Sequence, residues 1–424
     1  MKKSIIKSVV LFLIILISIF VGYENPELIE SAKSIFKVEE KTFEIDEEKI
    51  EEIDTGNEEK VFHIEAEIKA NSFSLKLLKV KTLLDQSASL FISKNANGEE
   101  SFKFFSQDGF LILENNRIKI NLPSSYYDKN IDSFYPSSLQ GGVKSVIFIN
   151  NEYFALISSK KGDCIYASII SLKNKREILK SECLPDSANV DFAGLGSAYL
   201  ILEDNLLLSI GAPENSSQII SELAQNKDSI FGKILNIEIK SISSKEDTNI
   251  KYNFFSTGHR NPQGLALLEG DIFSLEHGPQ GGDELNKISK GNNYGWPVVS
   301  YGTKYNYGTS YSTDHTQSNF QAPIYFFNPA IAPSALSKCP KNLSDYYKNN
   351  NCLMGLSLAG QSILIFLLDK ENNKVLSVEK IFIGKRLRHF GIKESGDLFL
   401  SNENYFYITA DRDGVYKVKF DKFR

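Results

Sequence analysis

Residues 198–211, AYLILEDNLLLSIG, contain two apolar runs on either side of a short polar stretch. Asp and Asn tolerate the backbone angles of hairpin turns, so this stretch predicts two antiparallel strands joined at Asp204–Asn205. Residues 146–159, VIFINNEYFALISS, repeat the pattern around Asn150–Asn151. A further turn of this kind is expected at Glu269–Gly270. Together these hairpins predict an all-β chain.

Short apolar runs and turns recur throughout residues 61–424, and long amphipathic helices are nearly absent. The one short helix candidate is SSQIISELAQ at 216–225. So many strands need an architecture that hides their edges, and a β-propeller does this by repeating four-stranded antiparallel blades around an axis. A sandwich or barrel suits this length less well. No strict repeat motif such as a WD dipeptide marks the blades.

The composition is that of an ordinary globular protein. Of 424 residues, 42% are hydrophobic and 24% are charged, which permits a sizeable core. The net charge is -5, and lysine and arginine are scattered along the chain. A nucleic-acid partner is therefore not expected, because such proteins carry a concentrated basic surface.

The N-terminus predicts export. Lys2, Lys3 and Lys7 precede an apolar run from Val9 to Val21, which is typical of a signal peptide or of an uncleaved membrane anchor at residues 1–22. The run is short for a full span and no clear cleavage site follows it. Both interpretations place the protein in the periplasm or elsewhere outside the cytoplasm, and as an anchor residues 4–22 would tether it to the inner membrane. Residues 23–60 are acidic and predict a flexible linker ahead of one folded domain at 61–424.

Four cysteines are present, which in an oxidising compartment suggests disulfides. Their spacing favours the pairs Cys164 with Cys183 and Cys339 with Cys352. A metal site is less consistent with the sequence, because no pair has C-x-x-C spacing and no histidine lies nearby. Free buried thiols are the remaining alternative.

Four segments carry more polar and glycine residues than strands and turns require: GHRNPQGL (258–265), EHGPQGGDELN (276–286), GNNYGWPVVSYG (291–302) and GKRLRHF (384–390). The first can present a guanidinium group, which grips planar carboxylates. The second combines a stiff Gly-Pro turn with carboxylates, and its oxygens could face a hard cation. In the fourth, Arg386 and Arg388 alternate and so share one face of a strand. Ordinary turns with surface ion pairs are the alternative explanation.

These segments resemble the glucose/sorbosone dehydrogenase family, most closely over residues 257–302. FGKILNIEI (231–239), FFNPAIAPSAL (326–336) and residues 381–419 are also similar to it. The resemblance implies a six-bladed β-propeller that binds pyrroloquinoline quinone (PQQ) and calcium at the mouth of its central channel. It further implies oxidation of an aldose at C1 to the lactone, by hydride transfer to the quinone, with an electron acceptor that the sequence does not identify.

The resemblance also implies roles for individual residues. Arg260 and Asn261 would contact the quinone, with Gln263 in support, and Arg386 and Arg388 would hold it from the other side. The Gly278 and Pro279 carbonyls would bind the calcium, and Asp283 would support their loop. The side chain of Glu284 and the carbonyl of Tyr294 match a second, structural calcium site. Tyr325, Phe326 and Phe327 occupy the positions of aromatics that stack on the sugar.

The sequence departs from the family at three positions. No histidine occurs in NVDFAGLGSAYLILEDN (189–205), where the family carries its catalytic base, and Asp191 is the nearest candidate. A carboxylate can serve as a base if its pKa suits the task. Ala359 stands at or near a lysine position, and His389 replaces an aspartate, which would make the charge beside Arg388 depend on pH. The departures leave open an alternative function, a catalytically impaired propeller that binds a glycan or a protein partner.

Overall fold

The computed structural model describes residues 65–70, 73–113, 116–128, 141–185, 192–212, 219–243, 245, 250–305, 308–316, 319–421 and 423. All of them belong to the compact unit Val61–Arg424. The predicted signal or anchor (1–22), the linker (23–60) and Asp191 lie outside the described residues. Within the described part, no helix has the length and hydropathy needed to cross a bilayer.

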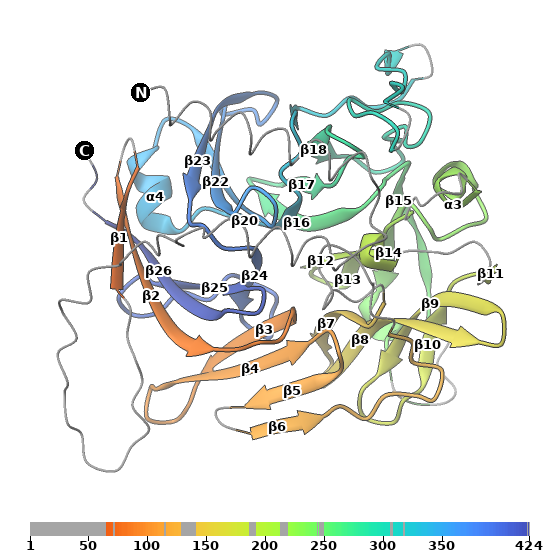
Figure 1. Ribbon diagram of the computed structural model, residues 1–424, viewed down its shortest axis with the longest axis horizontal. Coiled ribbons are helices and arrows are strands. Elements are labelled where there is room, and N and C mark those ends of the chain that lie inside the picture. Colours follow the sequence, from red (N-terminus) through yellow and green to blue (C-terminus); the bar gives the residue numbers. More distant parts are fainter. Residues whose placement is uncertain are drawn as a thin grey trace, which may run out of the picture. The chain divides into compact units, whose positions relative to one another are not determined.

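The chain is all-β, and its sheets are built mainly from runs of four antiparallel strands (Figure 1). Three sheets have exactly this form. Their strands are β12 (Gly196–Leu202), β13 (Asn205–Ile210), β14 (Lys233–Glu238) and β15 (Tyr252–Thr257); β16 (Pro262–Leu268), β17 (Asp271–Glu276), β18 (Asp283–Ile288) and β19 (Tyr325–Phe327); and β20 (Pro333–Lys338), β21 (Asn351–Ser357), β22 (Ser362–Leu368) and β23 (Val375–Phe382).

The remaining strands form two larger sheets. A five-stranded sheet contains β7 (Val143–Ile149), β8 (Glu152–Lys161), β9 (Cys164–Ser171), β10 (Glu177–Lys180) and β11 (Leu184–Pro185). A nine-stranded sheet contains β1 (Glu65–Lys69), β2 (Ser74–Thr82), β3 (Ser87–Lys94), β4 (Glu100–Ser106), β5 (Phe110–Leu113), β6 (Asn116–Lys119), β24 (Leu387–Ile392), β25 (Phe406–Ala410) and β26 (Gly414–Asp421). Within it, β24 and β3 meet through two parallel pairs, whereas all other pairings are antiparallel.

Helices in the described residues are short. α3 (Ile219–Glu222) continues into the 3-10 turn Leu223–Gln225, which agrees with the helix expected at 216–225. α4 (Lys341–Tyr346) follows β20, and two other 3-10 turns span Phe192–Gly194 and Ile239–Ser241. α3 with its 3-10 turn, α4 and Phe192–Gly194 each contribute buried side chains to a hydrophobic cluster, among them Phe192, Ile220, Ala224 and Leu343.

The predicted turns are confirmed, with one shift. Asn150 and Asn151 have φ angles of 52° and 59°, and Glu269 and Gly270 have 50° and 88°. The turn in the opening stretch lies one residue earlier than expected, because Leu202 pairs with Asn205 and Glu203 takes the positive φ. Pairing at that register keeps the apolar residues of β12 and β13 opposite one another.

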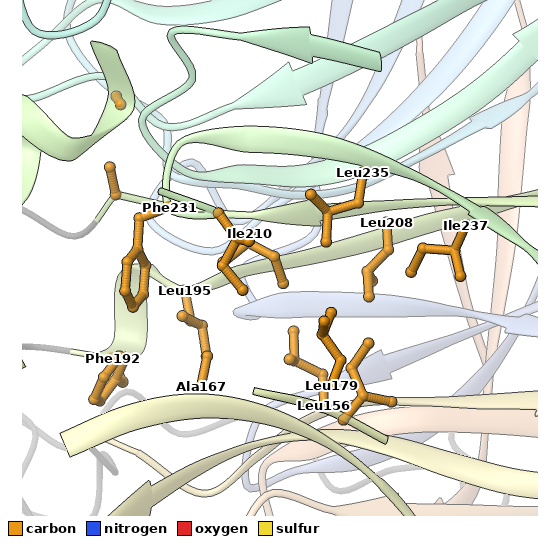
Figure 2. Close-up of a cluster of buried hydrophobic side chains, with 14 of the residues drawn as sticks. Leu156, Ala167, Leu179, Phe192, Leu195, Leu208, Ile210, Phe231, Leu235 and Ile237 are labelled. Atoms are coloured by element: carbon orange, nitrogen blue, oxygen red, sulfur yellow. The ribbon is translucent and has the colours of Figure 1, made fainter. Parts of the chain in front are cut away.

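The apolar runs are long because each sheet is covered on both faces. Along β13, Leu206, Leu208 and Ile210 belong to one hydrophobic cluster, whereas Leu207 belongs to another. Figure 2 shows the first cluster, in which Leu208 and Ile210 face Leu156 and other residues of the neighbouring sheet. Alternate side chains therefore pack against different sheets, and no polar face is needed on these strands.

The strands near the two ends of the described chain pair with each other. β2 runs antiparallel to β26 over eight residue pairs, from Ser74 with Asp421 to Thr82 with Gly414. Lys79 on β2 also forms an ion pair with Asp413, which immediately precedes β26. The fold is thus closed by main-chain hydrogen bonds between sequence-distant segments.

One central cavity is lined by strands from all five sheets. It has a volume of about 100 Å³ and is bordered by residues of β3, β7, β12, β16, β20 and β24. Strands that converge in this way on one axis are typical of a β-propeller. The structure also forms the two disulfides favoured by the cysteine spacing, Cys164–Cys183 and Cys339–Cys352, with Cα separations of 5.2 Å and 5.5 Å.

Candidate functional site

Two of the polar segments meet at one end of the β16–β19 sheet. GHRNPQGL leads into β16, and EHGPQGGDELN joins β17 to β18. Pro262 pairs with Glu276 across β16 and β17, and Glu276 pairs with Glu284 across β17 and β18. This register brings residues 260–262, 276–278 and 283–284 to the same end of the sheet.

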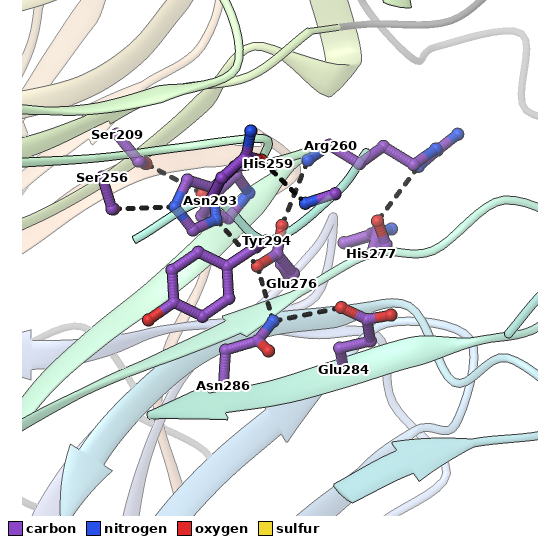
Figure 3. Close-up of polar contacts among 12 residues, drawn as sticks. Ser209, Ser256, His259, Arg260, Glu276, His277, Glu284, Asn286, Asn293 and Tyr294 are labelled. Atoms are coloured by element: carbon purple, nitrogen blue, oxygen red, sulfur yellow. Dashed lines mark hydrogen bonds and ion pairs between the residues drawn. The ribbon is translucent and has the colours of Figure 1, made fainter. Parts of the chain in front are cut away.

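Glu276 lies at the centre of a buried polar network at this edge (Figure 3). Its Oε1 is 3.1 Å from His259 Nδ1 and accepts a 2.8 Å hydrogen bond from Asn286 Nδ2, while its Oε2 accepts one from the Arg260 backbone N–H. His259 Nε2 lies 2.8 Å from Ser256 Oγ. Because Ser256, His259 and Glu276 are all buried, this serine–histidine–glutamate row cannot reach a substrate and instead fixes the backbone beside Arg260.

Arg260 leaves part of its guanidinium group free. Its Nη1 donates to the His277 carbonyl at 3.3 Å, and its group lies 5.4 Å from the ring of Trp296. Its Nε–H is buried and has no hydrogen-bond partner. A buried donor without a partner is costly, so this N–H is available to an anionic or carbonyl oxygen.

Asp283 holds the Gly278 loop from behind. Its Oδ1 accepts a hydrogen bond from Gly278 N–H at 2.9 Å, and its Oδ2 accepts two more from the N–H groups of Ile331 and Ala332. A side chain on Gly278 would place its Cβ 2.2 Å from the Gly282 carbonyl oxygen, so only glycine fits there. Both oxygens of Asp283 are used on backbone groups, in agreement with a supporting position.

A second carboxylate lies close to Glu276. Burial raises the pKa of Glu284 to about 8, and the neighbouring Glu276 carboxylate adds to the shift. Asn286 bridges the two, with its Nδ2 donating to Glu284 Oε2 at 3.1 Å, and its own Oδ1 is buried without a partner. Two neighbouring carboxylates and an unpaired amide oxygen are the kind of oxygen ligands that a hard cation prefers.

Four of the five predicted calcium-site residues, Gly278, Pro279, Glu284 and Tyr294, line one small cavity, and Asp283 does not. Arg260, Glu276 and His277 line it as well, and its volume of about 10 Å³ leaves room for one ion or water. No group of three or more histidine, cysteine or acidic side chains is arranged to hold a metal among the described residues. A cation here would therefore need backbone carbonyl oxygens as well as side chains.

The second pair of predicted arginines belongs to another sheet, because Arg388 lies on β24. Burial lowers the pKa of His277 to about 4; the Asp283 carboxylate opposes the shift, and the positive charges of Arg260 and Arg388 increase it. Arg388 is also bound in bidentate fashion to Asp411, at 2.6 and 2.5 Å. Arg386 lies just before β24, and its carbonyl accepts a hydrogen bond from Asp411 N–H.

His389 lies beside Arg388, where a pH-dependent charge was expected, and its surroundings move its titration to acid pH. Burial lowers the pKa of His389 to about 3, and Arg388 and Lys144 lower it further. Its Nδ1 lies 3.0 Å from Ser87 Oγ, and the residue lines the central cavity. The imidazole therefore stays uncharged at neutral pH.

Asn261 and Gln263 contact the neighbouring sheet. The Oδ1 of Asn261 accepts hydrogen bonds from Gly196 N–H at 3.0 Å and from Gln263 Nε2 at 2.7 Å. Gln263 Nε2 also donates to the Gly196 carbonyl at 2.9 Å. The two amides thus bind both polar backbone groups of one glycine.

The three predicted sugar-stacking aromatics separate by strand alternation. Phe327 is 2% exposed and packs in the core against Phe366, so it cannot contact a substrate, and Tyr325 is half-buried beside it. Phe326 is 43% exposed and stacks on Tyr301, with ring centroids 4.2 Å apart. Only Phe326 therefore presents an open ring face.

Sequence reasoning missed Glu276, Asn286 and Lys233. Glu276 closes the apolar strand DIFSLE, and an acidic residue at the end of a buried strand is a signal that could have identified it. Lys233 is fully buried and donates to the carbonyls of Leu223, Ala224 and Phe231. A lysine within the apolar stretch FGKILNI could have indicated a buried lysine with a structural role.

Comparisons with known proteins place this chain in a family. A family model described as Glucose / Sorbosone dehydrogenase matches residues 169–406, which is more than half of the chain. An uncharacterized protein, slr1608, from Synechocystis is 31% identical over 223 residues, or 50% of this chain and 52% of that protein. Aldose sugar dehydrogenase YliI from Escherichia coli is 28% identical over 146 residues, covering 32% and 38% of the two chains. The matches thus span about half or less of these relatives.

Solved structures share the fold over a longer stretch. The soluble aldose sugar dehydrogenase from Escherichia coli, in its apo-form, superposes with a TM-score of 0.59 at 18% identity and covers 81% of this chain and 99% of its own. The PQQ-bound aldose sugar dehydrogenase from Streptomyces coelicolor gives a TM-score of 0.52 at 16% identity, covering 83% and 99%. With the family match over residues 169–406, the chain belongs to the glucose/sorbosone dehydrogenase family.

Proposed function

We propose that this protein oxidises an aldose at C1 to the lactone, with PQQ and calcium as cofactors. The observation that carries the proposal is the small cavity that Arg260 shares with the Gly278–Pro279 turn and Glu284, where the buried Nε–H of Arg260 has no partner. A cationic group with an open donor beside a Gly-Pro turn and a carboxylate suits an anionic ligand and a divalent cation together.

The residues present fit these groups. Arg260 Nε–H has no partner and could donate to a carboxylate or quinone oxygen, and the carbonyls of Gly278 and Pro279 could hold the calcium beside it. The side chain of Glu284 and the carbonyl of Tyr294 remain the predicted ligands of a second, structural calcium. The small cavity has space for the ion alone, so the quinone must lie outside it. When bound, PQQ would supply a hydride acceptor, and calcium would make its carbonyl more electrophilic.

The chain itself would position and desolvate the reactants. Glu276 fixes the backbone of Arg260, and Asp283 fixes Gly278, so both contacts are set before a ligand arrives. Phe326 offers an exposed ring for the apolar face of a sugar. Asp191 remains the predicted base that takes the C1 hydroxyl proton, and it lies outside the described residues.

A second function has one observation in its favour. Arg388 directs two of its nitrogens to Asp411, so part of the charge expected to hold the cofactor is already neutralised. Together with the absent family histidine, this suits a propeller that has lost catalysis and binds a glycan or a protein. Binding of PQQ without turnover would identify that case.

The architecture and location belong to the same proposal. We take the nine-stranded sheet as two blades joined at β24 and β3, which gives six blades with the other four sheets. The closure of β2 on β26 supports this interpretation, because propellers must join their ends. The two disulfides support an extracytoplasmic location, and the mass of the mature protein would show whether residues 1–22 are removed or retained as an anchor.

The test is turnover by the purified full chain. It is incubated with PQQ and calcium, a panel of aldoses is added, and reduction of an artificial electron acceptor is followed. The proposal expects turnover that is lost in Arg260→Leu and Asp191→Asn and retained in Arg117→Leu, whose side chain pairs with Asp85 and Asp108 away from the site. Absence of turnover in the loaded wild-type protein would refute it.

A further inference from the structure

The amide pair, Asn261 and Gln263, holds a strained piece of backbone. Gly196 and Ser197, at the start of β12, have φ angles of 77° and 91°. Such an angle is unusual for serine and costs on the order of 1–3 kcal/mol unless the surroundings enforce it. The amide pair supplies that enforcement, because it binds both the N–H and the carbonyl of Gly196.

Packing around Gly196 leaves little freedom for another arrangement. A Cβ added to Gly196 would lie 2.8 Å from the Gly211 nitrogen, and one added to Gly211 would lie 2.1 Å from the Gly194 carbonyl oxygen. The Gly211 N–H also donates to the Leu195 carbonyl at 2.7 Å. Residues 194–197 are therefore confined between β13 and the amide pair.

Further hydrogen bonds join residues 260–263 to the sheet that contains β12 and β13. The Ala212 N–H donates to the Arg260 carbonyl at 2.8 Å, and Ser209 Oγ donates to the Pro262 carbonyl at 3.0 Å. Residues 260–263 are thus bound to the ends of β12 and β13 by both main-chain and side-chain groups. These bonds hold Arg260 in a fixed position relative to the central cavity, which Ser197 and Gln263 both line.

We propose that Asn261 and Gln263 are positioning residues, which fix residues 194–197 against Arg260. The segment they hold follows Asp191 by three residues in the sequence. The inference deepens the proposed function, and its cofactor arm rests on that function. Its structural arm concerns only the backbone of Gly196 and does not need a cofactor.

Substitutions of Asn261 test whether its oxygen holds the Gly196 backbone. Asn261→Asp keeps an oxygen that can accept from Gly196 N–H and from Gln263. Asn261→Leu has a similar size and removes that acceptor. Gln263→Met is a second variant that removes the donor to the Gly196 carbonyl without adding a buried charge.

The structural arm measures amide hydrogen exchange of peptides covering 192–197 in the full chain without cofactor. We expect faster exchange in Asn261→Leu and Gln263→Met, because the Gly196 backbone loses its partners, and wild-type protection in Asn261→Asp. Glu371→Leu, an exposed substitution, is the control for general destabilisation. Unchanged exchange at 192–197 in both Asn261→Leu and Gln263→Met would overturn the inference.

The cofactor arm is a PQQ titration in calcium of the same variants. Positioning predicts that Asn261→Leu and Gln263→Met bind PQQ at least tenfold more weakly than the wild type, because Arg260 and residues 194–197 lose their fixed geometry, and wild-type affinity in both variants would overturn the inference. If the wild-type protein binds no PQQ, the proposed function fails, and the exchange measurement still decides the role of the amide pair.

Discussion

At the scale of single residues, Glu276 organises the candidate site. It accepts hydrogen bonds from the backbone of Arg260 and the side chain of Asn286, and it contacts His259. The residue is buried, so none of these groups can turn to water instead. Removing the carboxylate would therefore leave several polar groups unpaired at once, each at a cost of about 1–3 kcal/mol.

The first prediction concerns this carboxylate. Glu276→Leu should lower the free energy of unfolding by at least about 3 kcal/mol, because buried partners lose their acceptor. Chemical denaturation of the variant measures the change. The exposed substitution Glu371→Leu should stay within about 0.5 kcal/mol of the wild type. Equal stability of the two variants would show that Glu276 does not organise the network.

The second prediction uses two adjacent phenylalanines with opposite environments. Phe327→Ala should cost about 3–5 kcal/mol of stability because it opens a cavity in the core. Phe326→Ala should cost about 1 kcal/mol, the worth of its stacking on Tyr301, while raising the KM for the sugar. Thermal unfolding and steady-state kinetics separate the two effects, and an unchanged KM in Phe326→Ala would remove this residue from the substrate site.

At the scale of elements, the pairing of β2 with β26 closes the fold, and Asp413 reinforces it. Its carboxylate is bound by Lys79 of β2 at 2.5 Å, by Lys385 at 2.9 Å and by the Tyr416 hydroxyl at 2.6 Å. Burial alone would raise the pKa of Asp413, but the hydrogen bonds from Lys79, Tyr416 and Lys385 outweigh it and lower the pKa to about 2.

The third prediction follows from that pKa. A carboxyl whose pKa is lower in the folded state stabilises the protein above its unfolded pKa near 3.8, and the stabilisation is lost as the pH falls towards 2. The shift corresponds to about 2 kcal/mol. Asp413→Asn should abolish this part of the pH dependence between 4 and 2 in acid unfolding curves. Asp345→Asn, at a well-exposed site, should leave it intact, and identical curves for the two variants would contradict the assignment.

Strands and turns could be predicted from the sequence where the local pattern of apolar and turn-forming residues alone determines the structure. Asn150–Asn151 forms the expected hairpin because two residues that tolerate positive φ stand between apolar runs. The Asp204–Asn205 turn moved by one residue because cross-strand packing of leucines outweighed the local preference of Asn. The pairing of β2 with β26 could not be predicted from local sequence, because the two strands lie more than 300 residues apart in the chain.

The candidate site was predictable in part, for the same reason. Gly278, Pro279, Arg260 and Glu284 share one cavity, as linked motifs suggested. The role of Asn261 was not readable from the sequence, because its partner, Gly196, lies on another sheet. Phe326 and Phe327 looked equivalent as letters, and only strand alternation distinguishes the exposed ring from the core one.

At the scale of the whole molecule, the proposed cofactor site depends on sheets that bring sequence-distant segments to one axis. Arg260 immediately precedes β16 and Arg388 lies on β24, so the predicted cofactor residues come from different sheets. The central cavity is lined by six strands. A site of this kind exists only if the sheets are arranged as described, so ligand binding reports on the global fold as well as on the site.

The most direct measurement is a calorimetric titration of PQQ into the full chain, with and without calcium. The account predicts saturable binding that requires calcium, that weakens by at least tenfold in Arg260→Leu, and that is unchanged in Arg117→Leu. No binding in the presence of calcium, or equal binding by the Arg260→Leu and wild-type proteins, would contradict the claim that these segments build one cofactor site.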